Sequence, residues 1–122
     1  MHFEISVRRV FCASHQLRLP DGSLEPLHGH NWELTVTVAA DKLDGMDCVM
    51  DFHDLEKQID ERLKPWQNAH LNDVEPFAGG KRNPSAERVA QAAAENLRLP
   101  SGVRLVRSEV TEAPGCVARF LP

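Results

Sequence analysis

Apolar and polar side chains alternate along the first forty residues of the chain, which is the pattern of half-buried β-strands. One apolar row predicts a strand over residues 2–15; the row is interrupted at Arg9 and ends at His15. A second row predicts a strand over about residues 30–40. Residues 16–27 hold two prolines and a glycine, and they predict a long connection between the strands. The two rows consist of Phe3, Ile5, Val7, Phe11 and Ala13, and of Trp32, Leu34, Val36 and Val38.

Apolar residues change to helical spacing in the middle of the chain. Asp51 is a suitable N-cap for a first helix, and Pro65 ends it. A second helix is predicted to start after the N-cap Ser85 and to stop before Pro100, while residues 66–84 are predicted to be irregular. The apolar positions are Phe52, Leu55, Ile59 and Leu63 in the first helix, and Val89, Ala93 and Leu97 in the second.

Two further strands are predicted near the end of the chain. They cover residues 103–112 and 116–121 and are joined through Pro114 and Gly115. The element order is therefore ββααββ. Antiparallel hairpins with two helices on one face make an α+β fold, and we expect a single domain over residues 1–122.

Composition and charge narrow the possible functions. The net charge is −4 and basic residues are mixed with acidic ones, which argues against nucleic acid or an anionic membrane as a partner. The three cysteines are widely spaced, as expected in a reducing compartment. No apolar run approaches membrane-spanning length, and the first residues do not form a signal peptide. We therefore expect a soluble, cytoplasmic protein.

Three histidines are placed to meet at one end of the predicted sheet. Side chains two residues apart on a strand share a face, so His28 and His30 continue the apolar row of Trp32. Antiparallel pairing with the first strand brings them next to His15. Three imidazoles with an open fourth position are the composition of a catalytic zinc site. The alternative is a group of structural histidines with satisfied hydrogen bonds.

Glu112 is a candidate binding residue at the end of a later strand. It shares a strand face with Val106, Ser108 and Val110, so its side chain is expected to point inward. A carboxylate there can accept two hydrogen bonds from a planar amidine-like group, as in a pterin or guanine ring. The alternative is a solvated glutamate at a strand end.

Short motifs along the chain match those of a known family in order and spacing. Together they resemble the 6-pyruvoyl-tetrahydropterin synthase / 6-carboxy-tetrahydropterin synthase family, and the resemblance covers nearly the whole chain. The motifs are Phe11-Cys12-Ala13-Ser14-His15, Leu27-His28-Gly29-His30-Asn31, Met50-Asp51-Phe52, Leu71-Asn72-Asp73, Asn83-Pro84-Ser85-Ala86-Glu87 and Thr111-Glu112.

The resemblance implies the tunnelling fold (T-fold), in which ββααββ subunits form an oligomeric barrel, commonly a homohexamer made of two trimers. It implies Zn2+ bound by His15, His28 and His30. It also implies that Glu112 anchors a pterin, that the substrate is 7,8-dihydroneopterin triphosphate, and that the site lies at a subunit interface.

The chain departs from the family at the residues that transfer protons. Leu24 stands where the family has a catalytic cysteine, and Gln67 and Asn68 stand where it has an Asp-His pair. Glu25 resembles the glutamate of a variant subfamily that replaces the cysteine and releases 6-hydroxymethyl-7,8-dihydropterin, a folate precursor. His70 is a second candidate catalytic residue.

Several functions remain open from the sequence. The first is a zinc-dependent pterin lyase with a pyruvoyl or carboxy product, as in tetrahydrobiopterin or queuosine biosynthesis. The second is the variant type that serves folate synthesis. The third is a catalytically degenerate protein that binds zinc and pterin, and a zinc hydrolase of another substrate is a further alternative. Lys81 and Arg82 are candidates for binding the triphosphate.

Overall fold

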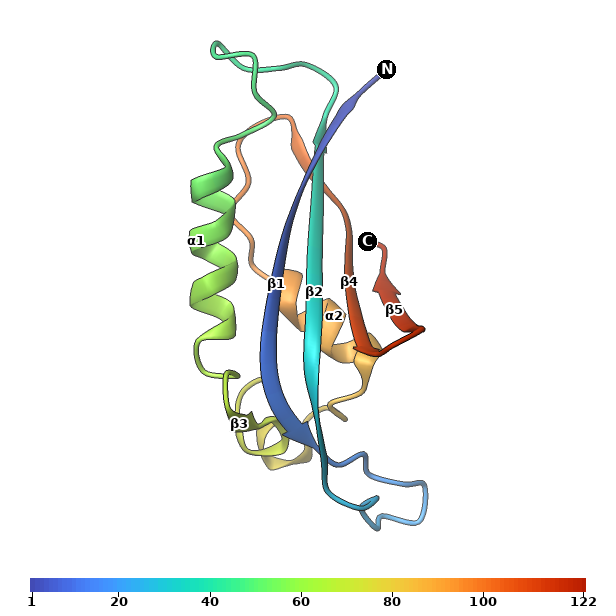
Figure 1. Ribbon diagram of the computed structural model, residues 1–122. Helices are drawn as coiled ribbons and strands as arrows, with labels where there is room; N and C mark the ends of the chain where they lie inside the picture. The colour runs from blue at the N-terminus through green and yellow to red at the C-terminus, as the bar shows by residue number, and fades with distance from the viewer.

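A hairpin of two long strands forms the centre of the computed structural model, which describes residues 1–122 (Figure 1). β1 (Phe3–His15) and β2 (His28–Ala40) pair antiparallel along their whole length, from Phe3 opposite Ala40 to His15 opposite His28. The alternating pattern therefore predicted both strands and their pairing correctly. β2 starts at His28, slightly earlier than expected, so this histidine belongs to the sheet.

The remaining strands extend this hairpin on both sides. β4 (Val103–Ala113) pairs antiparallel with β2, and β5 (Cys116–Phe120) pairs antiparallel with β4. β3 (Ala69–His70) runs parallel to the end of β1, so the strand order is β3-β1-β2-β4-β5. The sequence did not predict β3, because two residues are too few to carry a periodicity.

Two helices cover one face of the sheet (Figure 1). α1 (Phe52–Leu63) and α2 (Ala86–Ala94) begin as expected, since the side chains of Asp51 and Ser85 each accept a hydrogen bond from a backbone N–H of the first turn. A single apolar core lies between the helices and the sheet. Neither helix has the length and apolar composition needed to cross a membrane.

Two details of the helices differ from the prediction. α2 stops at Ala94, before Leu97, because Asn96 has a φ of 63° that is incompatible with a continuing helix. Phe52 is half exposed rather than buried. Helical spacing predicts that Phe52 shares a face with the buried residues of α1, but it does not predict how much of that face the sheet covers. The irregular segment before α2 contains two short 3-10 helices, η1 (Leu71–Asp73) and η2 (Ala78–Gly80).

Arg9 interrupts the apolar row of β1 because it pairs with α1. Its Nε donates to Asp60 Oδ1, and its Nη2 donates to Glu56 Oε2, each at 2.7 Å. These two carboxylates raise the pKa of the Arg9 guanidinium above its ordinary value. The charge in the row is therefore compensated, and it connects β1 to α1.

Candidate metal centre

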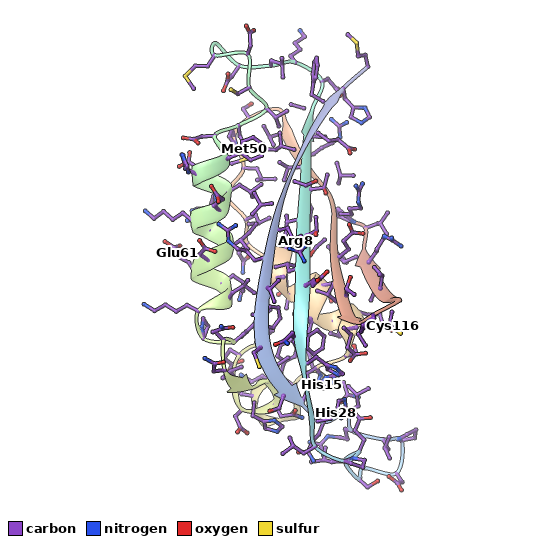
Figure 2. The ribbon with its side chains drawn as sticks, viewed as in Figure 1. Arg8, His15, His28, Met50, Glu61 and Cys116 are labelled. Atoms are coloured by element: carbon purple, nitrogen blue, oxygen red, sulfur yellow. The ribbon has the colours of Figure 1, made fainter.

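The register of the hairpin brings three histidines together at one end of the sheet. His15 lies opposite His28, and His30 lies two residues further along the same face of β2. The ring centroids are 4.5 Å apart for His15 and His28, 5.1 Å for His15 and His30, and 4.9 Å for His28 and His30. Figure 2 shows His15 and His28 side by side where the loop leaves the hairpin. The clustering predicted from the strand ends is confirmed.

Backbone carbonyl groups orient two of the three rings. His15 Nδ1 donates to the carbonyl oxygen of Pro84 at 2.7 Å, and His28 Nδ1 donates to that of Pro26 at 2.9 Å. A proton held on Nδ1 leaves the Nε2 lone pair free. Histidines that bind metal ions usually have this arrangement, because the outer hydrogen bond fixes the ring and the tautomer.

The inner nitrogens of the cluster lack hydrogen-bond partners. Nε2 of His15 and Nε2 of His30 are both buried and unsatisfied. Burial is the main reason that the pKa of His15 is lowered, against the opposing effects of the Pro84 carbonyl and of Glu112. A neutral imidazole with an unsatisfied buried nitrogen fits a metal ligand, because unpaired polar atoms are otherwise costly to bury.

Glu112 completes the cluster from β4. Its Oε1 lies 3.2 Å from His15 Nε2 and 3.5 Å from His30 Nε2, so the inward orientation expected for it is confirmed. Glu112 sits at a β-bulge between Thr111 and Ala113, a feature that often redirects a side chain beside a functional site. One ligand atom from each of the three histidines and from Glu112 lies within 4.8 Å of all the others, which is close enough to hold one metal ion.

Glu25 reaches the cluster from the loop between β1 and β2. Its Oε1 lies 3.7 Å from His28 Nε2 and accepts a hydrogen bond from the N–H of Leu17 at 3.0 Å. The Glu25 N–H in turn donates to the Leu17 carbonyl oxygen at 3.0 Å. The loop folds back on itself through these bonds. A carboxylate therefore lies beside the histidines, while the neighbouring Leu24 is exposed.

Two asparagines, which the sequence did not single out as site residues, fix the residues that follow His15. Asn72 accepts from the N–H of Gln16 at 2.9 Å and donates to its carbonyl at 2.7 Å. Asn83 bonds the backbone of Arg18 in the same way, at 2.7 and 2.9 Å. Both asparagines belong to motifs quoted above, and this was the only signal in the sequence.

The residues at the position of the Asp-His pair have another role here. The Gln67 side chain accepts from the N–H of Cys12 at 3.0 Å, and the Asn68 N–H donates to the Cys12 carbonyl at 2.6 Å. Both extend the edge of β1. His70 Nδ1 lies 2.9 Å from Ser14 Oγ, and Ser14 projects from the face of β1 opposite to His15. The described contacts of His70 are therefore not with the histidine cluster.

Lys81 and Arg82 already have carboxylate partners. Lys81 Nζ lies 2.8 Å from Glu75, and Arg82 Nη1 lies 2.7 Å from Glu95. Both cationic residues line a cavity of about 490 Å³ next to the loop after β1. A separate cavity of about 550 Å³ is lined by His30 and Glu112.

Comparison with known proteins agrees with the motifs. The family model described as 6-pyruvoyl tetrahydropterin synthase matches residues 4–122. Dihydroneopterin monophosphate aldolase of Pyrococcus furiosus is 32% identical over 114 residues, which cover 92% of this chain and 91% of that protein. 6-Carboxy-5,6,7,8-tetrahydropterin synthase of Bacillus subtilis is 28% identical over 122 residues, which cover 98% and 77%.

The fold is also similar to that of a solved structure with the same family name. The solved structure of Caenorhabditis elegans 6-pyruvoyl tetrahydropterin synthase superposes with a TM-score of 0.83 at 21% identity, over 100% of this chain and 96% of the other. The α+β sheet with two helices is thus the architecture of that enzyme's subunit. Since the family model covers nearly the whole sequence, this chain belongs to the 6-pyruvoyl tetrahydropterin synthase family.

Proposed function

We propose that the chain is a zinc-dependent aldolase that cleaves the side chain of a dihydroneopterin phosphate and releases 6-hydroxymethyl-7,8-dihydropterin. The observation that carries this proposal is the Glu25 carboxylate, 3.7 Å from His28 Nε2, beside a leucine at the position of the family's cysteine. The similarity to a dihydroneopterin monophosphate aldolase supports the same reaction class.

A synthase with a pyruvoyl or carboxy product is the less favoured reading. The family resemblance implies that such a reaction uses a Cys-Asp-His relay to move protons on side-chain carbons. Here Leu24 is exposed, and Gln67 and Asn68 are engaged with the backbone of Cys12. Cleavage of the side chain makes a smaller demand, because it begins with removal of a proton from a hydroxyl group, for which one carboxylate suffices.

The proposed metal ligands are His15, His28 and His30. Zinc suits three neutral imidazoles with an open position, and when bound it supplies Lewis-acid stabilisation of negative charge on the side-chain oxygens. The protein supplies the ring orientation through the carbonyl groups of Pro84 and Pro26. Burial lowers the pKa of His15, which favours the neutral imidazole that a cation requires.

Glu25 is the proposed acid–base residue. It takes the proton of the second hydroxyl of the side chain; the bond between the first and second side-chain carbons then breaks, and an aldehyde forms. The electron pair of that bond moves into the C=N group of the dihydropterin ring. Return of the proton to the first carbon gives 6-hydroxymethyl-7,8-dihydropterin and a phosphorylated two-carbon aldehyde, so the reaction needs no further reactant. We assign His70 no step, since it bonds Ser14 on the opposite face.

Glu112 is the proposed pterin anchor. The 550 Å³ cavity that it lines with His30 is wide enough for a bicyclic ring. A carboxylate matches the two neighbouring N–H groups of the pterin, which are arranged like those of a guanidinium group. Binding the ring at Glu112 would place the side chain over the histidines.

Assembly into a hexamer of two trimers is part of the proposal. β1 has a neighbour on its outer side only at Ala13 and Ser14, and β5 has none on its outer side. Long unpaired strand edges favour pairing with other chains. The mass in solution, measured by light scattering, tests the hexamer.

Product identification tests the reaction. Zinc-loaded protein is incubated with the mono- and triphosphates of 7,8-dihydroneopterin, and the pterins are identified by mass spectrometry. We expect 6-hydroxymethyl-7,8-dihydropterin. A pyruvoyl or carboxy product would establish a synthase instead. Bound but unchanged substrate would indicate a protein that binds zinc and pterin without turnover.

A further inference from the structure

A cavity of about 490 Å³ lies beyond the β1 end of the histidine cluster. Its walls come from the loop after β1 and from the segment that contains β3, η1 and η2. The walls are mainly polar, and three of the lining residues are cationic: Arg18, Lys81 and Arg82. The cavity is adjacent to the proposed active site, because Gln16 follows His15 and Leu24 precedes Glu25.

The three cations differ in their partners. Lys81 pairs with Glu75 and Arg82 pairs with Glu95, so most of their charge is compensated. The Arg18 guanidinium has no carboxylate partner; its hydrogen bond is a long one of 3.5 Å to the carbonyl of Gly22. The one carboxylate in the lining, Asp73, forms no ion pair with Arg18, so Arg18 is the lining arginine or lysine that remains without a carboxylate partner.

The backbone of the facing wall also suits an anion. Gly79 and Gly80 have φ values of 71° and 72°, and a Cβ on Gly80 would lie 3.2 Å from Arg18 Nη2. The glycine thus lets the guanidinium lie against this wall. The N–H groups of Lys81, Arg82 and Asn83 donate to no backbone carbonyl. Free N–H groups beside a glycine turn and a guanidinium are the usual components of a phosphate site.

We propose that this cavity binds the phosphate of the substrate and that Arg18 is the residue that selects for it. The inference rests on the proposed function. The strand order places Glu112 on β4, His28 and His30 on β2, His15 on β1, and the cavity beyond β1. The substrate has the same order of ring, hydroxyl groups and terminal phosphate. One uncompensated guanidinium matches a single phosphate group better than a triphosphate.

The test compares ligands that differ only in the phosphate. Affinities for dihydroneopterin, its monophosphate and its triphosphate are measured by anaerobic fluorescence titration of zinc-loaded Glu25→Gln protein, which does not consume the ligand. We expect the added Arg18→Gln substitution to weaken monophosphate binding by about tenfold to a hundredfold, and binding of dihydroneopterin by less than about twofold. Arg88→Gln, on the exposed side of α2, is the matched control and changes neither affinity.

Arg18→Gln is expected to fold, since Asn83 bonds only the backbone of this residue. Equal weakening of all ligands, or no weakening of any, would overturn the role of Arg18. A triphosphate that binds more than about tenfold tighter than the monophosphate would overturn the preference for one phosphate. Failure of the wild-type protein to form 6-hydroxymethyl-7,8-dihydropterin would refute the aldolase, while the affinity differences would still decide the phosphate site.

Discussion

Arg9 and His15 lie on the same core-facing row of β1, yet their polar atoms differ in whether they have partners. Arg9 donates to Asp60 and Glu56 at 2.7 Å each, and these carboxylates raise its pKa. His15 is buried, its pKa is lowered by desolvation, and its Nε2 has no hydrogen-bond partner although Glu112 lies 3.2 Å away.

The difference separates a structural polar residue from a functional one. The guanidinium of Arg9 donates its hydrogen bonds mainly to Asp60 and Glu56 of α1, so few donors remain for a ligand. The buried Nε2 atoms of His15 and His30 have no hydrogen-bond partner and remain free to bind a ligand. Burying them unpaired lowers the stability of the fold. A polar residue in an apolar row is therefore a candidate for a functional role when its buried polar atoms lack hydrogen-bond partners.

Removal of a histidine should have the largest effect. His15→Ala deletes one of three proposed ligands, and we expect zinc affinity to fall by at least about a hundredfold and turnover to disappear, because loss of outer-shell partners alone costs about 10–100-fold. Zinc content after dialysis and competition with a chelator measure this. His30→Ala, at a less buried position, repeats the test if His15→Ala unfolds.

The control for this prediction is His53→Ala. The His53 side chain is 90% exposed, and its removal should leave zinc binding intact. If His15→Ala and His30→Ala both kept a full complement of tightly bound zinc, the cluster would be structural, as the alternative reading of the sequence has it.

Glu25→Gln should have the next largest effect. The Oε1 atom of Glu25 accepts from the Leu17 N–H, but its Oε2 makes no hydrogen bond and is available for substrate, whereas both oxygens of Asp60 are engaged by Arg9. We expect turnover to fall by about a hundredfold to ten-thousandfold while zinc and pterin affinities are kept, because the amide preserves shape but cannot take a proton. Glu87→Gln, at an exposed position of α2, is the control. Unchanged turnover would remove Glu25 from the mechanism.

The sequence predicted those parts of the molecule that repeat or that lie on regular elements. The periods of β1 and β2 fixed which residues face the core, and the register then followed from pairing of the two rows, so the meeting of His15 with His28 was predictable. The path of the loop was not. Glu25 is held beside the cluster by hydrogen bonds with Leu17 and Gln16, and no periodicity describes an irregular turn.

Bonds between side chains and a distant backbone were also beyond the sequence. Asn72 and Asn83 hold the segment after His15 from 56 and 65 residues away. The ion pairs of Lys81 with Glu75 and of Arg82 with Glu95 were not predicted either, although these partners lie only 6 and 13 residues away. The sequence predicted both cationic residues as triphosphate ligands from their charge and their place beside Gly79 and Gly80, whereas in the cavity that they line Arg18 is the arginine without a carboxylate partner.

Asn72→Ala should have a moderate effect. Asn72 lines the 490 Å³ cavity, but both polar atoms of its amide bond the backbone of Gln16, and Gln16 Nε2 donates to the Glu25 carbonyl at 3.1 Å. The substitution removes two hydrogen bonds to Gln16, and we expect a loss of about 1–3 kcal/mol of stability. We expect kcat to fall about tenfold with little change in KM, because misplacement of Glu25 affects chemistry more than binding. Asn72→Asp keeps the acceptor and should recover part of kcat; equal kcat for both variants would assign Asn72 a purely structural role.

Arg9→Met should have the smallest effect, and its effect should depend on pH. The hydrogen bond from Arg9 is the main reason that the pKa of Glu56 lies below its ordinary value of 4.5. A carboxyl group with a lower pKa in the folded state stabilises the fold above about pH 4.5, and this contribution disappears as the pH falls through the lowered pKa. Thermal melts between pH 7 and pH 3 should therefore show a weaker acid-dependent loss of stability in Arg9→Met than in the wild type.

At pH 7 the melting temperature of Arg9→Met should drop by no more than about 5 °C, because the ion pair is partly exposed. Zinc binding and turnover should stay at wild-type values; loss of either would mean that Arg9 and His15 are coupled through β1 and do not have the separate roles that their surroundings indicate.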